Sequence, residues 1–250
     1  MGKLITADNC SLGWVSAVEH LLSSKDDCFN LIIEIEKPMM EDFKIRQLLD
    51  KFIESSKRIP IDEVANTIFP VSLYSQALGR RLLYENYETA WSSIKLFPQN
   101  RWGTYFYRMI HWEEDGTVLN QLENTIGKLK KTLSGKKYRS FYEVSIYRPK
   151  RDGHIPRGSP CLSHLSFKLE NDKLHLTAVY RNHYYIQRAY GNLVGLGHLM
   201  EFIAKESGIS VGRLTCISTH AELDGPKQVM TELVRSCKEM NPSKLTVISG

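Results

Sequence analysis

Polar and apolar residues alternate in two neighbouring stretches near the middle of the chain. The apolar positions are Leu165, Phe167 and Leu169, then Leu174, Leu176 and Ala178. A period of two places such side chains on one face of a β-strand. Asn171 and Asp172, between the two stretches, are typical of a tight turn. The pattern therefore predicts a β-hairpin.

A helical period is clearest in residues 118–133. After an initial pair, apolar residues recur there at steps of three and four: Val118, Leu119, Leu122, Ile126, Leu129 and Leu133. Ser134 and Gly135 are expected to end this helix. Further helices are expected at 14–22, 41–54, 73–91, 194–204 and 227–240, and further strands at 29–35, 141–147, 211–219 and 244–248. Residues 58–70, with proline near both ends, are expected to cross the surface as a connection.

Length and composition indicate a globular protein. The 250 residues are 42% hydrophobic and 24% charged, and such a chain can bury a sizeable core. No internal repeat or linker divides it, so we expect residues 1–250 to form one domain. No apolar run approaches a membrane span, and no basic stretch precedes an apolar core at the N-terminus. We therefore expect a soluble, cytoplasmic protein without membrane contact.

Charge and cysteine usage narrow the possible partners. The net charge of +5 is compatible with an anionic small ligand and too diffuse to favour nucleic acid. The five cysteines are widely spaced, without a Cys-x-x-Cys pair, which argues against a disulfide framework or a zinc site. Because the histidines show no ligand spacing with them either, we expect no metal.

Two candidate chemical groups flank the predicted hairpin. Cys161 follows Pro160 in a turn-like segment, and Arg181 stands twenty residues later. A cysteine acts as a nucleophile when nearby cations favour its thiolate, and arginine can also hold a phosphate through two parallel hydrogen bonds. A free cysteine alone is more often a small buried hydrophobic residue. The alternative for Cys161 is therefore core packing.

This order of residues resembles the thymidylate synthase family. The resemblance rests on Pro160-Cys161, the hairpin, Arg181, Asn192 and His220, and it covers residues 118–224, whereas residues 1–117 diverge. It implies an α+β fold in which flanking helices cover a mixed, twisted sheet. It also implies a homodimer formed sheet to sheet. The aromatic pair Phe141-Tyr142 and the run Tyr180, Tyr184 and Tyr185 would then be candidates for dimer contacts, with core packing as the simpler alternative for any single tyrosine.

The resemblance also implies roles for individual residues. Cys161 would attack C6 of a pyrimidine nucleotide, and Arg181 and Arg139, the latter from the second subunit, would hold its phosphate. Asn192 would accept from N3–H and donate to O4, which favours a uracil-type base. A helix cap is the alternative for Asn192. The remaining substrate-binding positions would be Asn182, His220 and Glu222.

The sugar-binding positions leave further alternatives. His220 would orient a sugar hydroxyl or a water, or it would be an ordinary surface histidine. Glu222 stands where the family has tyrosine, and a carboxylate can accept from two vicinal hydroxyls. A ribonucleotide is therefore conceivable beside a deoxyribonucleotide.

Several positions depart from the family pattern. Tyr184 replaces an aspartate that contacts the cofactor, 5,10-methylenetetrahydrofolate, and Leu162 replaces the histidine that follows the catalytic cysteine. The family's Asp-Arg-Thr-Gly phosphate loop has no counterpart. Because the nucleophile Cys161 and the base-reading Asn192 are nevertheless present, we expect a methyl- or hydroxymethyltransferase acting on C5. A folate-independent relative and a nucleotide-binding or sensing protein without turnover are the alternatives.

Overall fold

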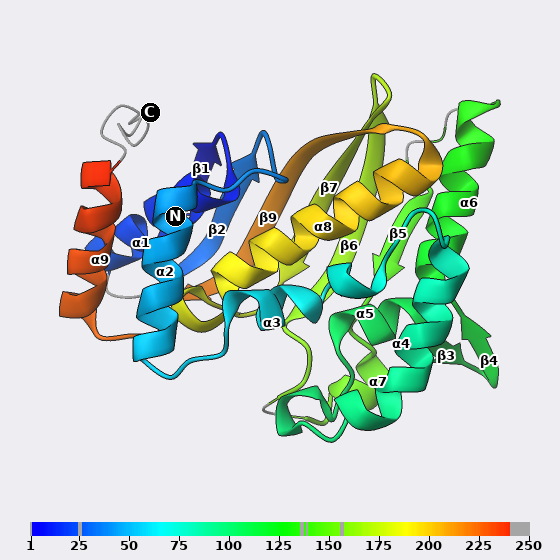
Figure 1. Cartoon of the computed structure of the whole chain (residues 1–250), viewed down its shortest axis with the longest axis horizontal. Coiled ribbons are helices and arrows are strands. Elements are labelled where there is room, and N and C mark those ends of the chain that lie inside the picture. Colours follow the sequence, from blue (N-terminus) through cyan, green and yellow to red (C-terminus); the bar gives the residue numbers. More distant parts are fainter. Residues whose placement is uncertain (1, 25–26, 136–137, 139, 156–157, 241–250) are drawn as a thin grey trace.

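A mixed, twisted sheet forms the centre of the computed structural model of the chain (Figure 1). The structure describes residues 2–24, 27–135, 138, 140–155 and 158–240, so Arg139 and the expected strand 244–248 lie outside it. The strands are β1 (Lys3–Ala7), β2 (Asp27–Ile35), β3 (Trp112–Glu114), β4 (Thr117–Leu119), β5 (Tyr142–Ser145), β6 (Leu162–Glu170), β7 (Lys173–Tyr180), β8 (His183–Tyr184) and β9 (Ser210–Glu222).

The order of the main sheet is β1-β2-β9-β7-β6-β5, and the short β8 pairs with β9. β1 runs parallel to β2, and β7 and β8 run parallel to β9, while the other neighbours are antiparallel. β3 and β4 form a separate two-stranded sheet. Mixed pairing with flanking helices agrees with the expected α+β class.

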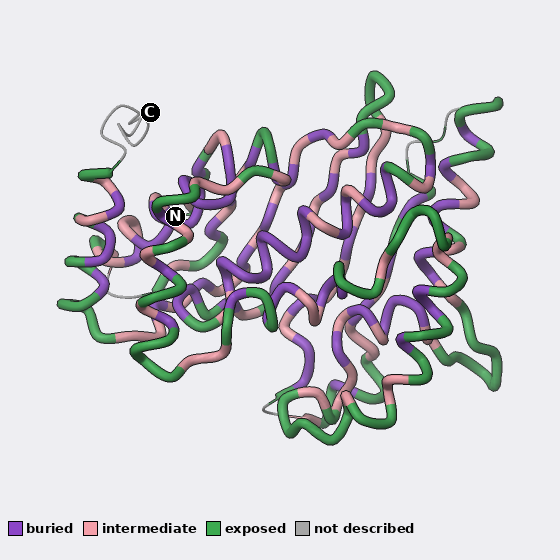
Figure 2. Tube along the Cα trace, in the orientation of Figure 1, coloured by how far each residue is buried: buried purple, intermediate pink, exposed green. Residues whose placement is uncertain are grey.

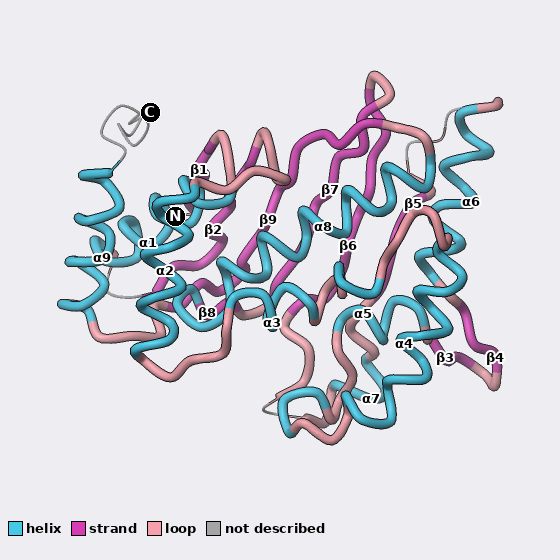
Figure 3. The backbone as a smooth tube through the Cα atoms, in the orientation of Figure 1, coloured by secondary structure: helices cyan, strands magenta, loops and turns pink. Residues whose placement is uncertain are grey.

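Helices flank this sheet, mostly at its two ends, and one of them crosses its centre (Figure 3). Their bounds are α1 (Cys10–Ser23), α2 (Phe43–Ser55), α3 (Ile61–Asn66), α4 (Arg80–Ile94), α5 (Tyr105–Ile110), α6 (Gln121–Leu133), α7 (Pro149–Asp152), α8 (Tyr190–Ser207) and α9 (Lys227–Met240). Short helical turns occupy η1 (Val71–Leu73), η2 (Pro98–Asn100) and the π-helical η3 (Tyr185–Ala189).

The core lies between the sheet and helix α8, which is buried along most of its length (Figure 2). Every second residue of β7 is buried, from Leu174 to Tyr180, because a strand presents alternate side chains to opposite faces. Helix α8 connects β8 to β9 and lies over this buried face. The start of α8 is thereby held next to the ends of β7 and β8.

Glycines allow helix α3 to approach α8 closely. A Cβ atom at Gly195 would lie 2.6 Å from the carbonyl oxygen of Ala65, and one at Gly191 would lie 2.7 Å from Cβ of Val64. These distances are shorter than van der Waals contacts. The two glycines thus set the spacing between the helices.

The second face of the sheet is partly exposed and more polar. The residues that alternate with the buried ones include Glu143, which bonds with His164 at 2.8 Å and with Lys168 at 2.6 Å. Arg213 similarly lies 3.3 Å from Glu34, beside a hollow of about 570 Å³. Among the described residues, α1 contacts β1 and β2, α6 contacts β5, and α8 contacts β7 and β9.

Three sequence expectations are corrected by the structure. Residues 58–70 are not a surface connection, since they contain α3 and bury Ile61, Ile68 and Phe69. The helix expected from residue 118 begins at Gln121, and Val118 and Leu119 belong to the exposed strand β4. The helix expected at 73–91 begins at Arg80. For residues 58–70 the reason is that α3 packs on α8, a partner that the local pattern does not contain.

Tyr142, Tyr180 and Tyr185 are fully buried within the chain. The prediction of dimer contacts is therefore wrong for these three, which pack in the core, whereas Phe141 and Tyr184 are partly exposed and for them it stays a prediction.

Candidate functional site

A cavity of about 660 Å³ opens where β6 begins and β7 ends. Its described wall also draws on α3, on the segment before α5, on β8 and on the start of α8. Of the residues singled out in the sequence, the cavity brings together Cys161, Arg181, Asn182, Tyr184 and Asn192. Among these, Cys161 and Asn192 are 31 residues apart in the chain, and the wall that α3 contributes is more remote still.

The hairpin places Cys161 beside Arg181. Asn171 and Asp172 have φ angles of +49° and +58°, the left-handed conformation that a two-residue hairpin turn requires. This turn fixes the register of β6 and β7, in which Leu162 pairs with Tyr180. The main-chain N–H of Arg181 then donates to the carbonyl oxygen of Cys161 at 2.9 Å.

The guanidinium of Arg181 holds the turn that carries the cysteine. Its Nε donates to the carbonyl oxygen of Pro160 at 3.0 Å, and its Nη2 donates to the carbonyl and hydroxyl oxygens of Ser159. Its Nη1 takes part in none of these bonds. Arg181 as a whole is exposed and belongs to the cavity lining, so it has a further N–H group to offer an anion.

The thiol of Cys161 is half-buried beside two arginines. Burial raises its pKa above the ordinary value of a thiol, while the charges of Arg181 and Arg188 oppose this rise. The hydroxyl of Tyr105 accepts from the main-chain N–H of Leu162 at 3.5 Å. Burial raises the pKa of Tyr105 to about 12, so at neutral pH this phenol remains protonated beside the thiol.

Asn192 does not cap a helix. It is the third residue of α8, only 3% exposed, and its Nδ2 lies 3.0 Å from Nε2 of the buried His183. His183 Nδ1 lies 2.9 Å from the hydroxyl of Ser218, which lies 3.0 Å from the hydroxyl of Tyr185. The sequence did not single out His183. The only local sign is that His183 and Tyr184 point to opposite faces of β8, where His183 is buried and Tyr184 is exposed.

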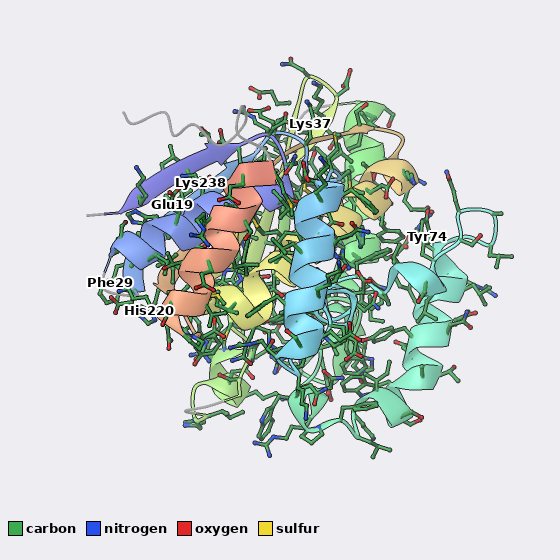
Figure 4. All side chains as sticks on the ribbon, turned by 60° about the vertical axis from the view of Figure 1, so that its left-hand side comes forward. Glu19, Phe29, Lys37, Tyr74, His220 and Lys238 are labelled. Atoms are coloured by element: carbon green, nitrogen blue, oxygen red, sulfur yellow. The ribbon has the colours of Figure 1, made fainter. Side chains whose placement is uncertain are left out.

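The remaining sugar-site candidates lie behind the cavity wall. The Oδ1 of Asn182 accepts from Nδ1 of His220, and the ring of His220 packs against Phe29 with centroids 5.3 Å apart (Figure 4). Glu222 pairs with Tyr184 in the sheet register. Neither His220 nor Glu222 belongs to the described lining of the cavity.

The outer part of the wall is cationic and aromatic. Arg188, which sequence analysis missed, lines the cavity with Tyr184, whose side chain is partly exposed. Among the described lining residues there is no Asp or Glu. This composition suits an anionic ligand.

A buried ion pair supports the segment that carries Tyr105. Arg108 contacts both carboxylate oxygens of Asp152, at 2.7 and 2.9 Å, and both side chains are fully buried. Arg108 also donates to the carbonyl oxygen of Trp102. Next to Trp102, Gly103 has φ +96°, and a Cβ there would lie 3.2 Å from Nε of Arg108. Sequence analysis missed this pair as well.

Two kinds of feature are absent from the described residues. No group of three or more His, Cys, Asp or Glu side chains is arranged to hold a metal ion. No described helix combines the length and apolar character needed to cross a bilayer.

Curated archaeal proteins are similar to part of the chain. Proteins named "Putative thymidylate synthase" match at 31% identity over 120 residues in Methanococcoides burtonii, 31% over 127 in Methanocaldococcus jannaschii and 28% over 148 in Methanosarcina barkeri. The matches cover 48%, 48% and 55% of this chain and 52%, 55% and 64% of those proteins. The chain thus spans about half the length of the curated relatives it matches.

No protein-family model matches the chain. These relatives nevertheless confirm the resemblance: over about half of its length the chain is similar to proteins named putative thymidylate synthase.

Proposed function

We propose that the cavity binds a pyrimidine nucleoside monophosphate, dUMP-like in its base, and that Cys161 attacks C6 of this base so that C5 gains a methyl or hydroxymethyl group. The observation that carries the proposal is that Cys161, Arg181 and Asn192 line one cavity, although the sequence connects them only by spacing. The archaeal relatives support the same substrate class.

The chain's residues suit the individual steps. The thiolate of Cys161 forms a bond to C6, and the electron pair of the C5–C6 double bond moves towards C5 and O4. An N–H of Asn192 stabilises the negative charge at O4. In a productive reaction the incoming one-carbon group would replace the C5 proton, which would pass to a base, and the thiolate would leave C6 as the double bond re-forms. A hydroxymethyl product would also require water, and a methyl product would require a hydride supplied by the one-carbon donor.

The one-carbon donor that the resemblance implies is 5,10-methylenetetrahydrofolate, whose bound form supplies the electrophilic carbon. The described cavity wall does not fit the family's folate site. Tyr184 stands in place of the aspartate that contacts folate, and none of the described lining residues is Asp or Glu. We therefore assign no step to this cofactor. This disagreement favours the second candidate, a folate-independent or non-catalytic nucleotide-binding protein.

We further propose that the chain acts as one domain and pairs through the second face of its sheet with another copy. The pairing is what the resemblance implies, and the partly exposed state of that face leaves it open to a partner. Arg139 of the partner subunit would then reach the phosphate, beside Arg181. Light scattering at micromolar concentration tests this, and a folded monomer would remove the second subunit from the site.

The chemistry is tested by the intact mass of the protein after incubation with 5-fluoro-dUMP, with and without methylenetetrahydrofolate. Once C5 has also gained a one-carbon group, the fluorine there cannot leave as a cation, so the ternary adduct persists. Wild type is compared with Cys161→Ser and, as the matched control, with Cys28→Ser, which alters another partly exposed thiol outside the cavity.

Each outcome selects one candidate. A ternary adduct that requires Cys161 supports folate-dependent transfer, and a binary adduct that requires Cys161 supports folate-independent chemistry. If no adduct forms but dUMP raises the melting temperature, the chain is a binding protein. If dUMP neither reacts nor binds, the proposal fails.

A further inference from the structure

The amide of Asn192 has a defined orientation in the buried network. Its nitrogen Nδ2, rather than its oxygen, lies 3.0 Å from Nε2 of His183. An amide nitrogen donates and does not accept. Nε2 must therefore be the acceptor, and the proton of the neutral ring must be on Nδ1, where it donates to the hydroxyl of Ser218 at 2.9 Å.

This orientation decides which hydrogen-bonding groups are left for a ligand. With one N–H committed to His183, Asn192 retains Oδ1 and a second N–H. An acceptor next to a donor complements the N3–H and O4 of a uracil-type base. Reversing the amide would exchange the two positions and complement the N3 and the 4-amino group of cytosine instead.

Stacking and hydrogen bonds hold the ring of His183 in one orientation. It stacks on Tyr180 with centroids 4.0 Å apart and an interplanar angle of 3°. Its two nitrogens are engaged by Asn192 and Ser218, and the side chain is 2% exposed. Burial also lowers the pKa of His183 to about 3, so Nε2 keeps its lone pair at neutral pH.

We propose that His183 is a positioning residue that selects the base, since its Nε2 holds the Asn192 amide in the orientation that accepts a 4-oxopyrimidine and rejects a 4-aminopyrimidine. The inference rests on the proposed function, because it assigns Asn192 to the base. It adds a residue that does not touch the ligand's pairing edge and acts through Asn192.

The specificity test compares the dissociation constants of dUMP and dCMP by calorimetry. In His183→Phe, which keeps an aromatic ring against Tyr180 but has no acceptor, the preference for dUMP should fall about threefold to tenfold, the weight of one lost hydrogen bond. Ser218→Ala, a smaller change that removes the partner of Nδ1, should lower the preference in the same direction. His183→Gln can accept through Oε1 and should restore part of it.

His198→Phe is the matched control. His198 lies on the same helix as Asn192, outside the described cavity lining, and its Nδ1 has no hydrogen-bond partner among the described residues. The control should keep the wild-type preference. An unchanged preference in both His183→Phe and Ser218→Ala overturns the proposal.

A second measurement needs no nucleotide. In protein labelled with ¹⁵N-histidine, the chemical shifts of the His183 ring distinguish a proton on Nδ1 from one on Nε2. We expect the proton on Nδ1, and a proton on Nε2 overturns the proposed orientation. If the proton is on Nδ1 but the wild-type protein binds neither nucleotide, the amide is oriented as inferred and the proposed function fails. Base selection by His183 is then overturned as well.

Discussion

The main-chain N–H of Arg181 donates to the carbonyl oxygen of Cys161 at 2.9 Å, although twenty residues separate them. The spacing follows from the hairpin, because β6 and β7 run out and back between these two residues. The thiol and the cation are therefore held at one end of the sheet by main-chain hydrogen bonds. Their proximity does not depend on a flexible loop.

Reactivity of Cys161 should depend on the neighbouring arginines. Because burial raises the pKa of this thiol and Arg188 opposes the rise, Arg188→Met should raise the pKa further. Alkylation by iodoacetamide at pH 8 should slow about threefold, because a smaller fraction of the thiol is then ionised. Peptide mass spectrometry in a Cys28→Ser background measures the rate. Arg81→Met, on the exposed face of α4, is the control, and equal rates in both variants contradict the role of Arg188.

The buried pair of Arg108 and Asp152 should matter strongly for stability. Removing one partner leaves the other charge buried, which costs about 3–5 kcal/mol. Arg108→Met and Asp152→Asn should both lower the free energy of unfolding in urea by amounts of this order. Arg81→Met breaks an exposed pair with Glu85 and should change it by less than about 1 kcal/mol. Losses below about 1 kcal/mol in both buried variants would show that the pair is dispensable.

His183 should make stability depend on pH. Its folded-state pKa of about 3 lies below the unfolded value of about 6.5, so between these values the unfolded chain binds more protons. Stability therefore rises with pH across this window, by about 1.4 kcal/mol per pH unit from this group. His183→Phe should reduce the slope between pH 4.5 and 6 by this amount. Parallel slopes in urea titrations would contradict the burial of a neutral ring.

Protonation of Asp152 should lower the free energy of unfolding at more acidic pH, separately from His183. Although burial alone would raise its pKa, the hydrogen bonds from Arg108 and from the main chain of Arg148 hold that pKa below its ordinary value. Its contribution is present above the unfolded value of about 3.9 and is lost as pH falls through the lower folded value. The free energy of unfolding of Asp152→Asn should lack this acid-side decline.

Two glycine-to-alanine changes should have opposite effects. Alanine normally stabilises a helix interior by about 1 kcal/mol relative to glycine. At Gly127 in α6 a Cβ meets no described atom within 4 Å, so Gly127→Ala should be stabilising. At Gly195 the same atom would lie 2.6 Å from the carbonyl oxygen of Ala65, so Gly195→Ala should be destabilising. Thermal unfolding measures both, and the same sign at both sites would refute the close packing of α3 on α8.

Local patterns predicted the elements whose structure depends on nearby residues. The alternation around Asn171 and Asp172 gave both strands of the hairpin, and residues 227–240 form helix α9 as expected. Residues 58–70 were misjudged because their burial comes from α8, more than a hundred residues later in the chain. Prolines at the ends of a segment give no information about such a remote partner.

The sequence by itself determined the hairpin, the main helical faces and the spacing of Cys161, Arg181 and Asn192, because each depends on the period of a strand or helix or on resemblance within one stretch. Only the tertiary structure decided that Arg188 and Tyr105 face Cys161, that Arg108 pairs with Asp152, and that His183 orients Asn192. Some of these contacts join segments that are remote in the chain. Others join residues of two successive elements, as His183 in β8 and Asn192 in α8 do. Their geometry is fixed by packing, for which a single sequence contains no periodic signal.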